Sequence, residues 1–266
     1  MLIFKLFKNF ILRPADAIDE ITANDFSFKT PLLIYAVYLV LNSVFMILKP
    51  SGFPAEFAGW ITEQRSFLFY LGNEAAWGSA LILISCAFLT YFIRPASTLH
   101  TTSEGRLALA GRSVGKLKFA AKAALGLILL FVFFEMIRQS ADGASVYVLF
   151  LGVSGYAAYA TFKNINLFAR ILKLSLTLLA IYTAFIPFFI VSSAVLKIEN
   201  LFILFQAGAV VWTLILMIKA VKIITGLTIG RILLCMIISS FYPVLIAYFL
   251  FKTGVISQDI LFLLFF

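Results

Sequence analysis

The sequence has one histidine, two cysteines and little charge: Lys, Arg, Asp and Glu together make up 12% of its 266 residues. A single histidine, His100, excludes any mechanism that needs a histidine pair. Cys86 and Cys235 both lie inside apolar runs and belong to no CxxC motif or Cys/His cluster. The pattern therefore predicts no metal site and no structural disulfide.

Catalytic motifs are scarce as well. The sequence contains no phosphate-binding loop, no Asp-rich lipid-synthase motif and no His-Glu-x-x-His element. Its two acidic clusters, Asp16–Glu20 and Glu56–Glu63, lie in amphipathic or loop contexts. We therefore expect a protein that is not an enzyme, with no catalytic residue and no cofactor.

Apolar residues are abundant. They make up 63% of the chain, including 30 phenylalanines, and the mean hydropathy is +1.06. A soluble domain is about 45–50% apolar and about 25% charged. Since no globular core could bury so much apolar surface, the composition predicts an integral membrane protein whose side chains largely face lipid.

The formal net charge of +9 could indicate a nucleic-acid partner. Here, however, the basic residues lie in short gaps between apolar runs, which is typical of the positive-inside rule. We therefore expect no nucleic acid. The expected partners are membrane lipids and a cytoplasmic protein, and the sequence carries no signal of oligomeric state.

Seven apolar runs are long enough to cross a bilayer, because about 17–25 helical residues suffice. They cover residues 32–48, 77–93, 119–137, 146–162, 171–196, 201–218 and 232–251. With this count, sixteen of the 21 Lys and Arg residues fall on the side of the N-terminus. The prediction is an all-α polytopic bundle of seven transmembrane helices with a cytoplasmic N-terminus and an external or lumenal C-terminus. It would lie in a bacterial inner membrane or a eukaryotic endomembrane.

Residues 1–30 are predicted to form a cytoplasmic interfacial segment before a single transmembrane domain, 31–266. Met1–Leu12 places lysines on one helical stripe and phenylalanines opposite, which predicts an N-terminal amphipathic helix. Pro14 can begin a second short helix. Its apolar residues would face the membrane or the bundle: Ala17, Ile18 and Ile21.

The connections between spans carry further candidates. The acidic and aromatic residues before Trp77, Glu74 among them, suggest a segment at the membrane interface. Residues 94–118 form the longest polar stretch and are strongly basic. Each Lys or Arg near an anionic lipid surface contributes about 1 kcal/mol. The candidate contacts with a partner or with lipid are Arg106, Arg112, Lys116, Arg170 and Arg231.

Three cytoplasmic connections end alike, with a small residue followed by a basic one before an outward-going helix. They are Gly111–Leu117, Ile165–Ile171 and Gly226–Ile232. Pro187 and Pro243, each mid-span in the two later hairpins, favour a parallel internal repeat. The alternative is that any helix leaving this face begins in the same way.

A few polar residues and the two prolines are candidates inside the membrane. Asn42 and Gln206 are predicted to donate hydrogen bonds between helices, and Pro187 and Pro243 to kink theirs. Glu135 and Arg138, three residues apart, are either a functional intramembrane pair or an interfacial ion pair that ends the helix.

Some of these residues carry a family resemblance. Phe162-Lys-Asn-Ile-Asn-Leu-Phe-Ala-Arg170, leading to Ile186-Pro-Phe188, resembles the middle of the YIP-domain family, named for membrane proteins that interact with Ypt/Rab GTPases. Val211-Trp-Thr-Leu with Thr225-Gly-Leu-Thr-Ile-Gly-Arg231 and Tyr242-Pro243 is similar to its last hairpin, and Leu12-Arg-Pro14 to its N-terminal helix. The family usually has five spans, so Trp77–Ile137 would be an extra hairpin, inserted or duplicated. The resemblance implies a small polytopic protein of membrane trafficking or organisation.

Two functions follow as hypotheses. The first is a non-enzymatic scaffold whose basic cytoplasmic face recruits a partner or anionic lipid. The second is a transporter or permease subunit for a lipidic or apolar solute, with Asn42 and Gln206 as polar contacts in a cavity near the prolines. The absence of a charged group at mid-membrane favours the scaffold.

Overall fold

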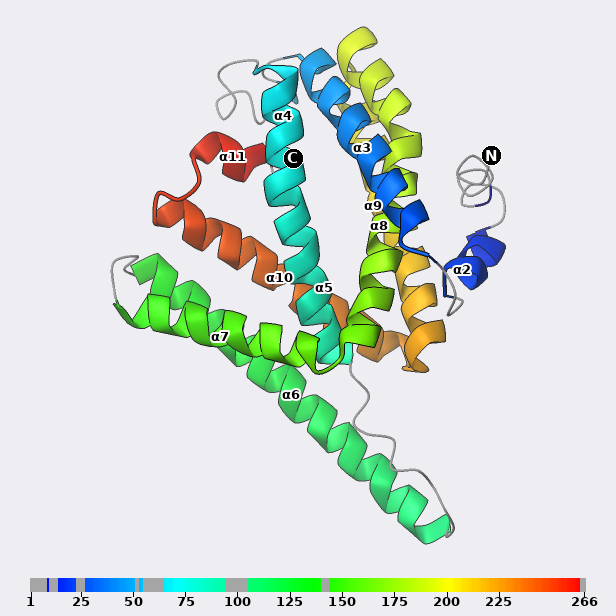
Figure 1. Ribbon diagram of the computed structural model, residues 1–266, viewed down its shortest axis with the longest axis vertical. Coiled ribbons are helices and arrows are strands. Elements are labelled where there is room, and N and C mark those ends of the chain that lie inside the picture. Colours follow the sequence, from blue (N-terminus) through cyan, green and yellow to red (C-terminus); the bar gives the residue numbers. More distant parts are fainter. Residues whose placement is uncertain are drawn as a thin grey trace. The chain divides into compact units, whose positions relative to one another are not determined.

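The computed structural model describes residue 9 and residues 14–22, 27–50, 53–54, 65–93, 105–139 and 144–263. Every regular element in these ranges is a helix (Figure 1). Among the described residues, six helices are long and apolar enough to cross a membrane. The predicted all-α fold with membrane-spanning helices is thereby confirmed.

The helices follow the predicted spans in order. They are α2 (Pro14–Thr22), α3 (Lys29–Leu48), α4 (Phe67–Asn73), the π-helical turn η2 (Glu74–Gly78), α5 (Ser79–Ile93), α6 (Gly105–Gln139), α7 (Ala144–Phe162), α8 (Ile165–Ile190), the π-helical turn η3 (Val191–Val195), α9 (Glu199–Thr225), α10 (Ile229–Lys252) and α11 (Gln258–Leu263). Six of the seven predicted spans correspond to these six helices. The remaining one, 146–162, corresponds to α7, whose apolar part, Tyr147–Phe162, is too short to be counted among them.

The second span begins ten residues earlier than predicted, at Phe67 instead of Trp77. Ser66 caps the helix, since its hydroxyl accepts a hydrogen bond from the backbone N–H of Phe69 at 3.3 Å. Polar residues 73 and 74 interrupt the apolar run, which is why the sequence pattern placed them in a loop. The helix continues through them, and Glu74 therefore lies inside a span of 27 residues.

The stretch 94–118 was predicted to be a polar connection between spans. In the structure α6 already begins at Gly105, within this stretch. Leucines and alanines between 107 and 110 are strong helix formers and explain the early start. Gly111–Leu117 consequently lies within a helix, whereas Gly226 has a φ of 66° and follows the end of α9. The three similar motifs thus do not share one turn conformation.

The chain forms two compact units. Unit 1 contains the described residues within 1–83, 169–224 and 256–266. Unit 2 contains those within 84–168 and 225–255.

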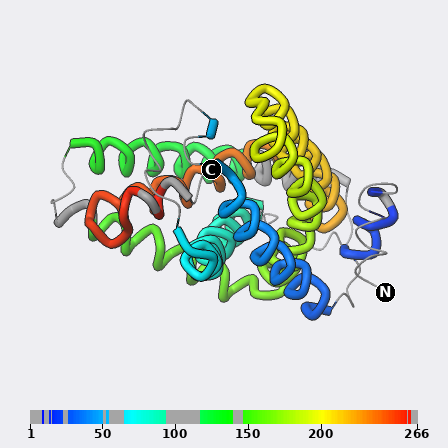
Figure 2. The backbone as a smooth tube through the Cα atoms, turned by 90° about the horizontal axis from the view of Figure 1, so that it is seen from above, coloured from blue at the N-terminus to red at the C-terminus, as the bar shows by residue number. Residues whose placement is uncertain are grey.

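In unit 1, α3, α8 and α9 lie side by side (Figures 1 and 2). Phe45 of α3, Phe189 of α8 and Phe202 of α9 form a triangle of rings with centroids 5.9–6.2 Å apart. Aromatic pairs at such distances contribute about 0.5–1.5 kcal/mol beyond the area they bury. This ring cluster is the centre of the unit 1 core.

Helix α2 begins at Pro14, as predicted. Its residues Ala17 and Ile18 are fully buried and Ile21 nearly so, while Asp19 and Glu20 are exposed. The short helix therefore packs with its apolar side against the protein. The predicted amphipathic helix Met1–Leu12 lies outside the described residues except for residue 9.

In unit 2, α10 packs closely on α6. The Tyr242 hydroxyl donates a hydrogen bond to the carbonyl oxygen of Gly126 at 3.1 Å, and its ring stacks on Phe88 at 4.0 Å. A Cβ atom on Gly126 would come within 2.7 Å of the ring of Phe92. Glycine is therefore required where α6 meets α5.

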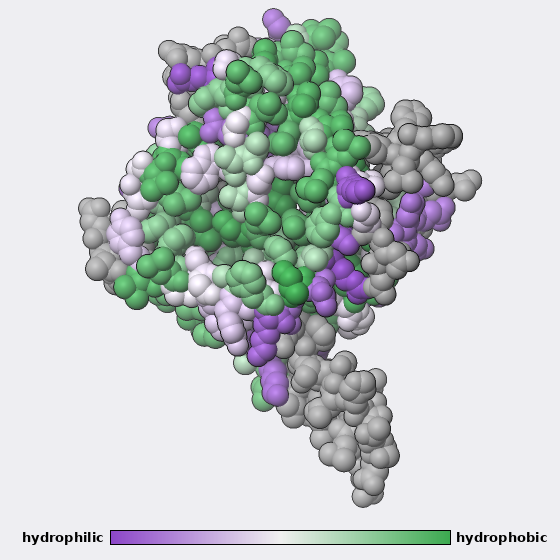
Figure 3. Space-filling model, viewed as in Figure 1, coloured by the Kyte–Doolittle hydropathy of each residue, from purple (hydrophilic) through white to green (hydrophobic). Residues whose placement is uncertain are grey.

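Many large apolar side chains remain exposed, such as Phe131 at 67% and Leu204 at 65%. Figure 3 shows hydrophobic residues over much of the face in view. A surface of this kind is stable in a bilayer and costly in water.

Candidate functional site

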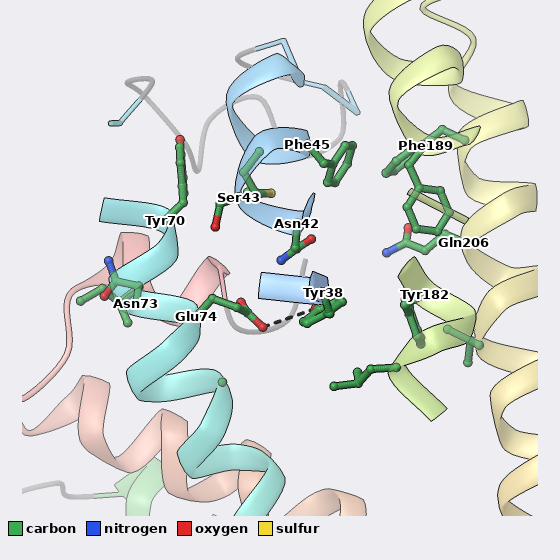
Figure 4. A pocket seen from close by; sticks show the side chains of 16 residues that line it. Tyr38, Asn42, Ser43, Phe45, Tyr70, Asn73, Glu74, Tyr182, Phe189 and Gln206 are labelled. Carbon is green, nitrogen blue, oxygen red and sulfur yellow. Dashed lines mark hydrogen bonds between the residues drawn. The ribbon is translucent and has the colours of Figure 1, made fainter. Parts of the chain in front are cut away.

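Unit 1 contains a cavity of about 340 Å³ (Figure 4). It lies between the second half of α3, the start of the second span, the second half of α8 and the first half of α9. Its walls are Tyr38, Asn42, Ser43, Phe45, Met46, Tyr70, Asn73, Glu74, Gly78, Leu179, Tyr182, Phe189, Phe202, Gln206, Val210 and Ile260. A volume in this range suits a small organic molecule.

Glu74 is the one charged residue among the described residues of these walls. It lies seven residues after the start of its span, about 10 Å along the helix. The Tyr38 hydroxyl donates to its Oε1 at 3.3 Å, a long hydrogen bond (Figure 4). Among the described residues, no Lys or Arg forms an ion pair with it. An intramembrane carboxylate with so little compensation is a functional candidate.

The backbone around Glu74 is shaped for this side chain. Residues 74–78 form a π-helical turn, a feature found frequently at functional sites. A Cβ atom on Gly78 would lie 2.8 Å from Oε1 of Glu74, so a larger residue there would displace the carboxylate from this position. Tyr35 fixes the turn from α3, since its hydroxyl donates to the Glu74 carbonyl at 3.3 Å and bonds with Ser79 Oγ at 2.7 Å.

The structure brings the two predicted amides, Asn42 and Gln206, to the same cavity. Neither forms a hydrogen bond to another described residue, so they do not join the helices as predicted. Ser43 and Asn73 are different, because both bond to carbonyls of their own helices. The amide groups of Asn42 and Gln206 are thus available to a bound molecule.

Aromatic rings complete the site. Tyr38, Tyr182 and the ring cluster of Phe45, Phe189 and Phe202 all contribute to the walls. The described walls therefore combine one carboxylate, three side-chain amides and several ring faces, and none of their residues is Lys, Arg or His. Chemically, the cavity can accept hydrogen bonds, balance a positive charge and pack against an apolar body.

Glu135 and Arg138 lie elsewhere, on α6 in unit 2. Arg138 donates from Nη2 and Nε to Oε2 of Glu135, at 2.8 and 3.0 Å, and its side chain is 64% exposed. An exposed ion pair contributes only about 0–1 kcal/mol. The geometry agrees with an interfacial pair near the end of the helix.

Pro187 and Pro243 do not line the cavity, and α8 and α10 continue through them. Pro187 leaves the carbonyl of Thr183 without an amide partner. The nearby serines bond elsewhere: Ser193 donates to the carbonyl of Phe189 and Ser239 to that of Cys235, both at 2.6 Å.

The basic candidates are not brought together at the cavity. Arg106, Arg112 and Lys116 lie on the first part of α6, where the described structure is limited to the backbone. Arg170 is half-buried on α8, and the Arg231 guanidinium lies 5.0 Å from the ring centroid of Phe119.

One short stretch of α6, Gly111-Arg-Ser-Val-Gly115, matches the letters of the hydrolase pattern Gly-x-Ser-x-Gly. In hydrolases that serine occupies a strained strand-to-helix turn. Here Ser113 lies inside a helix, and no strand is found in the described ranges. The match therefore lacks the structural context that the chemistry needs.

Glu74, Tyr38 and Tyr182 are among the site residues that the sequence interpretation missed. A signal for Glu74 exists in the spacing. Ser66 is a capping residue before an apolar run, and Gly78 follows Glu74 by four residues, so a helix over this stretch would put the glycine under the carboxylate. Tyr182 lies in an apolar run, and its role depends on the packing of α8 against α3.

The chain was compared with family models, curated proteins and solved structures, and none of them matches it.

Proposed function

We propose that this chain is a non-enzymatic integral membrane protein that binds a solute in the cavity of unit 1, as a transporter or permease subunit. The observation that carries the proposal is the group of polar side chains around one cavity. Asn42 and Gln206 form no hydrogen bond to another described residue, and the Glu74 carboxylate accepts one long hydrogen bond, from Tyr38. Polar side chains within a membrane-spanning bundle normally pair with one another or with the backbone. A ligand or water in the cavity would complete the hydrogen bonding of these three half-buried side chains.

The topology supports this proposal. The cavity is lined by the ends of α3 and α8 and by the beginnings of the second span and α9. Helices α3 and α8 therefore run in one direction, and the second span and α9 run in the opposite direction. Between α5 and α8 the chain must cross the membrane an even number of times, so if α6 crosses, α7 crosses back. This favours seven spans, and with a cytoplasmic N-terminus the cavity lies toward the external side.

A scaffold role is the second candidate, and one observation favours it. Helix α6 extends twelve residues beyond its apolar part, and this extension carries Arg106, Arg112 and Lys116. A basic helix next to a membrane attracts anionic lipid or an acidic partner. The resemblance to the YIP-domain family, and with it a role in membrane organisation, stays a prediction.

The transporter proposal is tested by the access of water-soluble reagents to the cavity. In a background with Cys86→Ala and Cys235→Ala, a single cysteine is introduced as Gln206→Cys. Methanethiosulfonate reagents react with thiolates in contact with water, so this cysteine is expected to react readily in lipid nanodiscs. Val211→Cys is the matched control, because Val211 lies on the same helix and is an exposed apolar side chain outside the cavity walls.

The measurement is the rate of modification, followed by mass spectrometry of the intact protein. We expect Gln206→Cys to react much faster than Val211→Cys. If both variants react at the same slow rate, water does not enter the cavity, and the proposed function is wrong.

A further inference from the structure

We infer that the molecule bound in the unit 1 cavity is an organic cation, whose ammonium group pairs with Glu74 and packs against the aromatic wall. This inference rests on the proposed function and names the class of its ligand. The described walls of this cavity carry one negative charge, that of Glu74, although the formal net charge of the protein is +9.

The charge of the cavity is the first step. Among the lining residues that the structure describes, Glu74 is the one ionisable group apart from the tyrosines Tyr38, Tyr70 and Tyr182, and none is basic. Two tyrosines of α3 donate hydrogen bonds to Glu74, both at 3.3 Å. Tyr38 donates to its carboxylate and Tyr35 to its backbone carbonyl. An ionised carboxylate in a region of low dielectric constant is costly unless a charge or good hydrogen bonds compensate it. A cation in the cavity would supply that compensation.

The rings give the second step. Ammonium groups, quaternary ones in particular, are bound on the faces of Tyr, Trp and Phe rings within about 6 Å of the centroid. The cavity offers such faces from α3, α8 and α9, including Tyr182 and Phe189, while Glu74 lies across from them on the second span (Figure 4). An anion would meet a carboxylate here, and a purely apolar molecule would leave Glu74, Asn42 and Gln206 unpaired.

The number of oxygen ligands distinguishes an organic cation from a metal ion. Calcium takes six to eight oxygens, usually with several carboxylates. The described walls of the cavity contain a single carboxylate, and no group of three His, Cys, Asp or Glu side chains is found within the described residues. Asn42 and Gln206 are suited to hydrogen-bond a hydroxyl or carbonyl on the body of the cation.

The experiment uses the Gln206→Cys protein and two protecting molecules of the same shape. Choline carries a trimethylammonium group, and 3,3-dimethylbutan-1-ol carries a tert-butyl group in its place. Each is titrated against modification by a neutral methanethiosulfonate. We expect choline to protect the cysteine at a concentration lower by about tenfold than the alcohol, since the charge should contribute about 1–2 kcal/mol.

The deciding variant is Glu74→Gln, which keeps the shape of the side chain and removes its charge. It should abolish the advantage of choline over the alcohol, while the cysteine still reacts with the neutral reagent alone, well above the rate of Val211→Cys. That remaining reactivity shows that the cavity is still formed. Glu135→Gln is the matched control, since it removes the carboxylate of another described span, outside the cavity, and it should leave the preference for choline intact.

The outcomes separate the two proposals. If Gln206→Cys does not react with any reagent, the proposed function fails. If it reacts but choline protects no better than the alcohol, or if Glu74→Gln keeps the preference, the cavity exists and the assignment to an organic cation is wrong.

Discussion

Replacing Gly126 with alanine is expected to lower the free energy of unfolding by about 1–3 kcal/mol, the usual cost of adding a methyl group to a tightly packed core. The new Cβ atom would lie 2.7 Å from two ring atoms of Phe92, which is itself 2% exposed and has little room to move. The same glycine supplies the carbonyl that accepts the hydrogen bond of Tyr242. A shift of α6 would therefore weaken the contacts with both α5 and α10.

The measurement is thermal unfolding in detergent, and Gly152→Ala is the control. Gly152 lies inside α7, and a Cβ atom there would meet nothing within 4 Å. The Gly152→Ala protein should be as stable as the unaltered protein or slightly more stable. If the Phe92 clash is the cause, adding Phe92→Leu to Gly126→Ala should restore part of the loss. Equal melting temperatures for Gly126→Ala and Gly152→Ala would contradict this packing.

Replacing Asn42 with tryptophan is expected to block the cavity. The side chain of Asn42 lines the cavity one helical turn after Tyr38 on α3 (Figure 4). An indole ring there would occupy much of the space and cover the polar groups. In the Gln206→Cys protein, Asn42→Trp should slow modification to the rate of the lipid-facing control, and choline should no longer have an effect.

Val40→Trp is the matched control for this variant. Val40 lies two residues away on the same helix, is 46% exposed and is not part of the cavity walls. A tryptophan at that position faces outward and should leave the modification rate unchanged. If both tryptophan variants slow the reaction equally, the effect comes from α3 as a whole and not from the cavity.

Much of the fold could be predicted from the sequence, because apolar runs of membrane length are a strong signal. The limits of α3 and α10 agree with the predicted spans within a few residues. Two boundaries were missed where helix geometry overrode hydropathy. The second span continues through residues 73 and 74, and α6 extends through a basic stretch that looked like a loop.

The candidate site could be predicted only in part. Asn42 and Gln206 stand out as amides in apolar runs, and both line the cavity. The sequence interpretation placed Glu74 in an interfacial loop. The transporter hypothesis was therefore judged without a charged group inside the membrane. Its meeting with Tyr38 and Tyr182 depends on how three helices distant in the sequence pack, which periodicity within one helix does not encode.

The most direct test of the solute-binding cavity is hydroxyl-radical footprinting of the unaltered protein in lipid nanodiscs, read by mass spectrometry. Tyrosine rings are oxidised where they meet water. Tyr38 and Tyr182 line the cavity, whereas Tyr242 is buried in unit 2 with 2% of its surface exposed. We predict that Tyr38 and Tyr182 are oxidised clearly faster than Tyr242 and that choline slows them selectively. Oxidation of all three at the same low rate would contradict a cavity open to solutes.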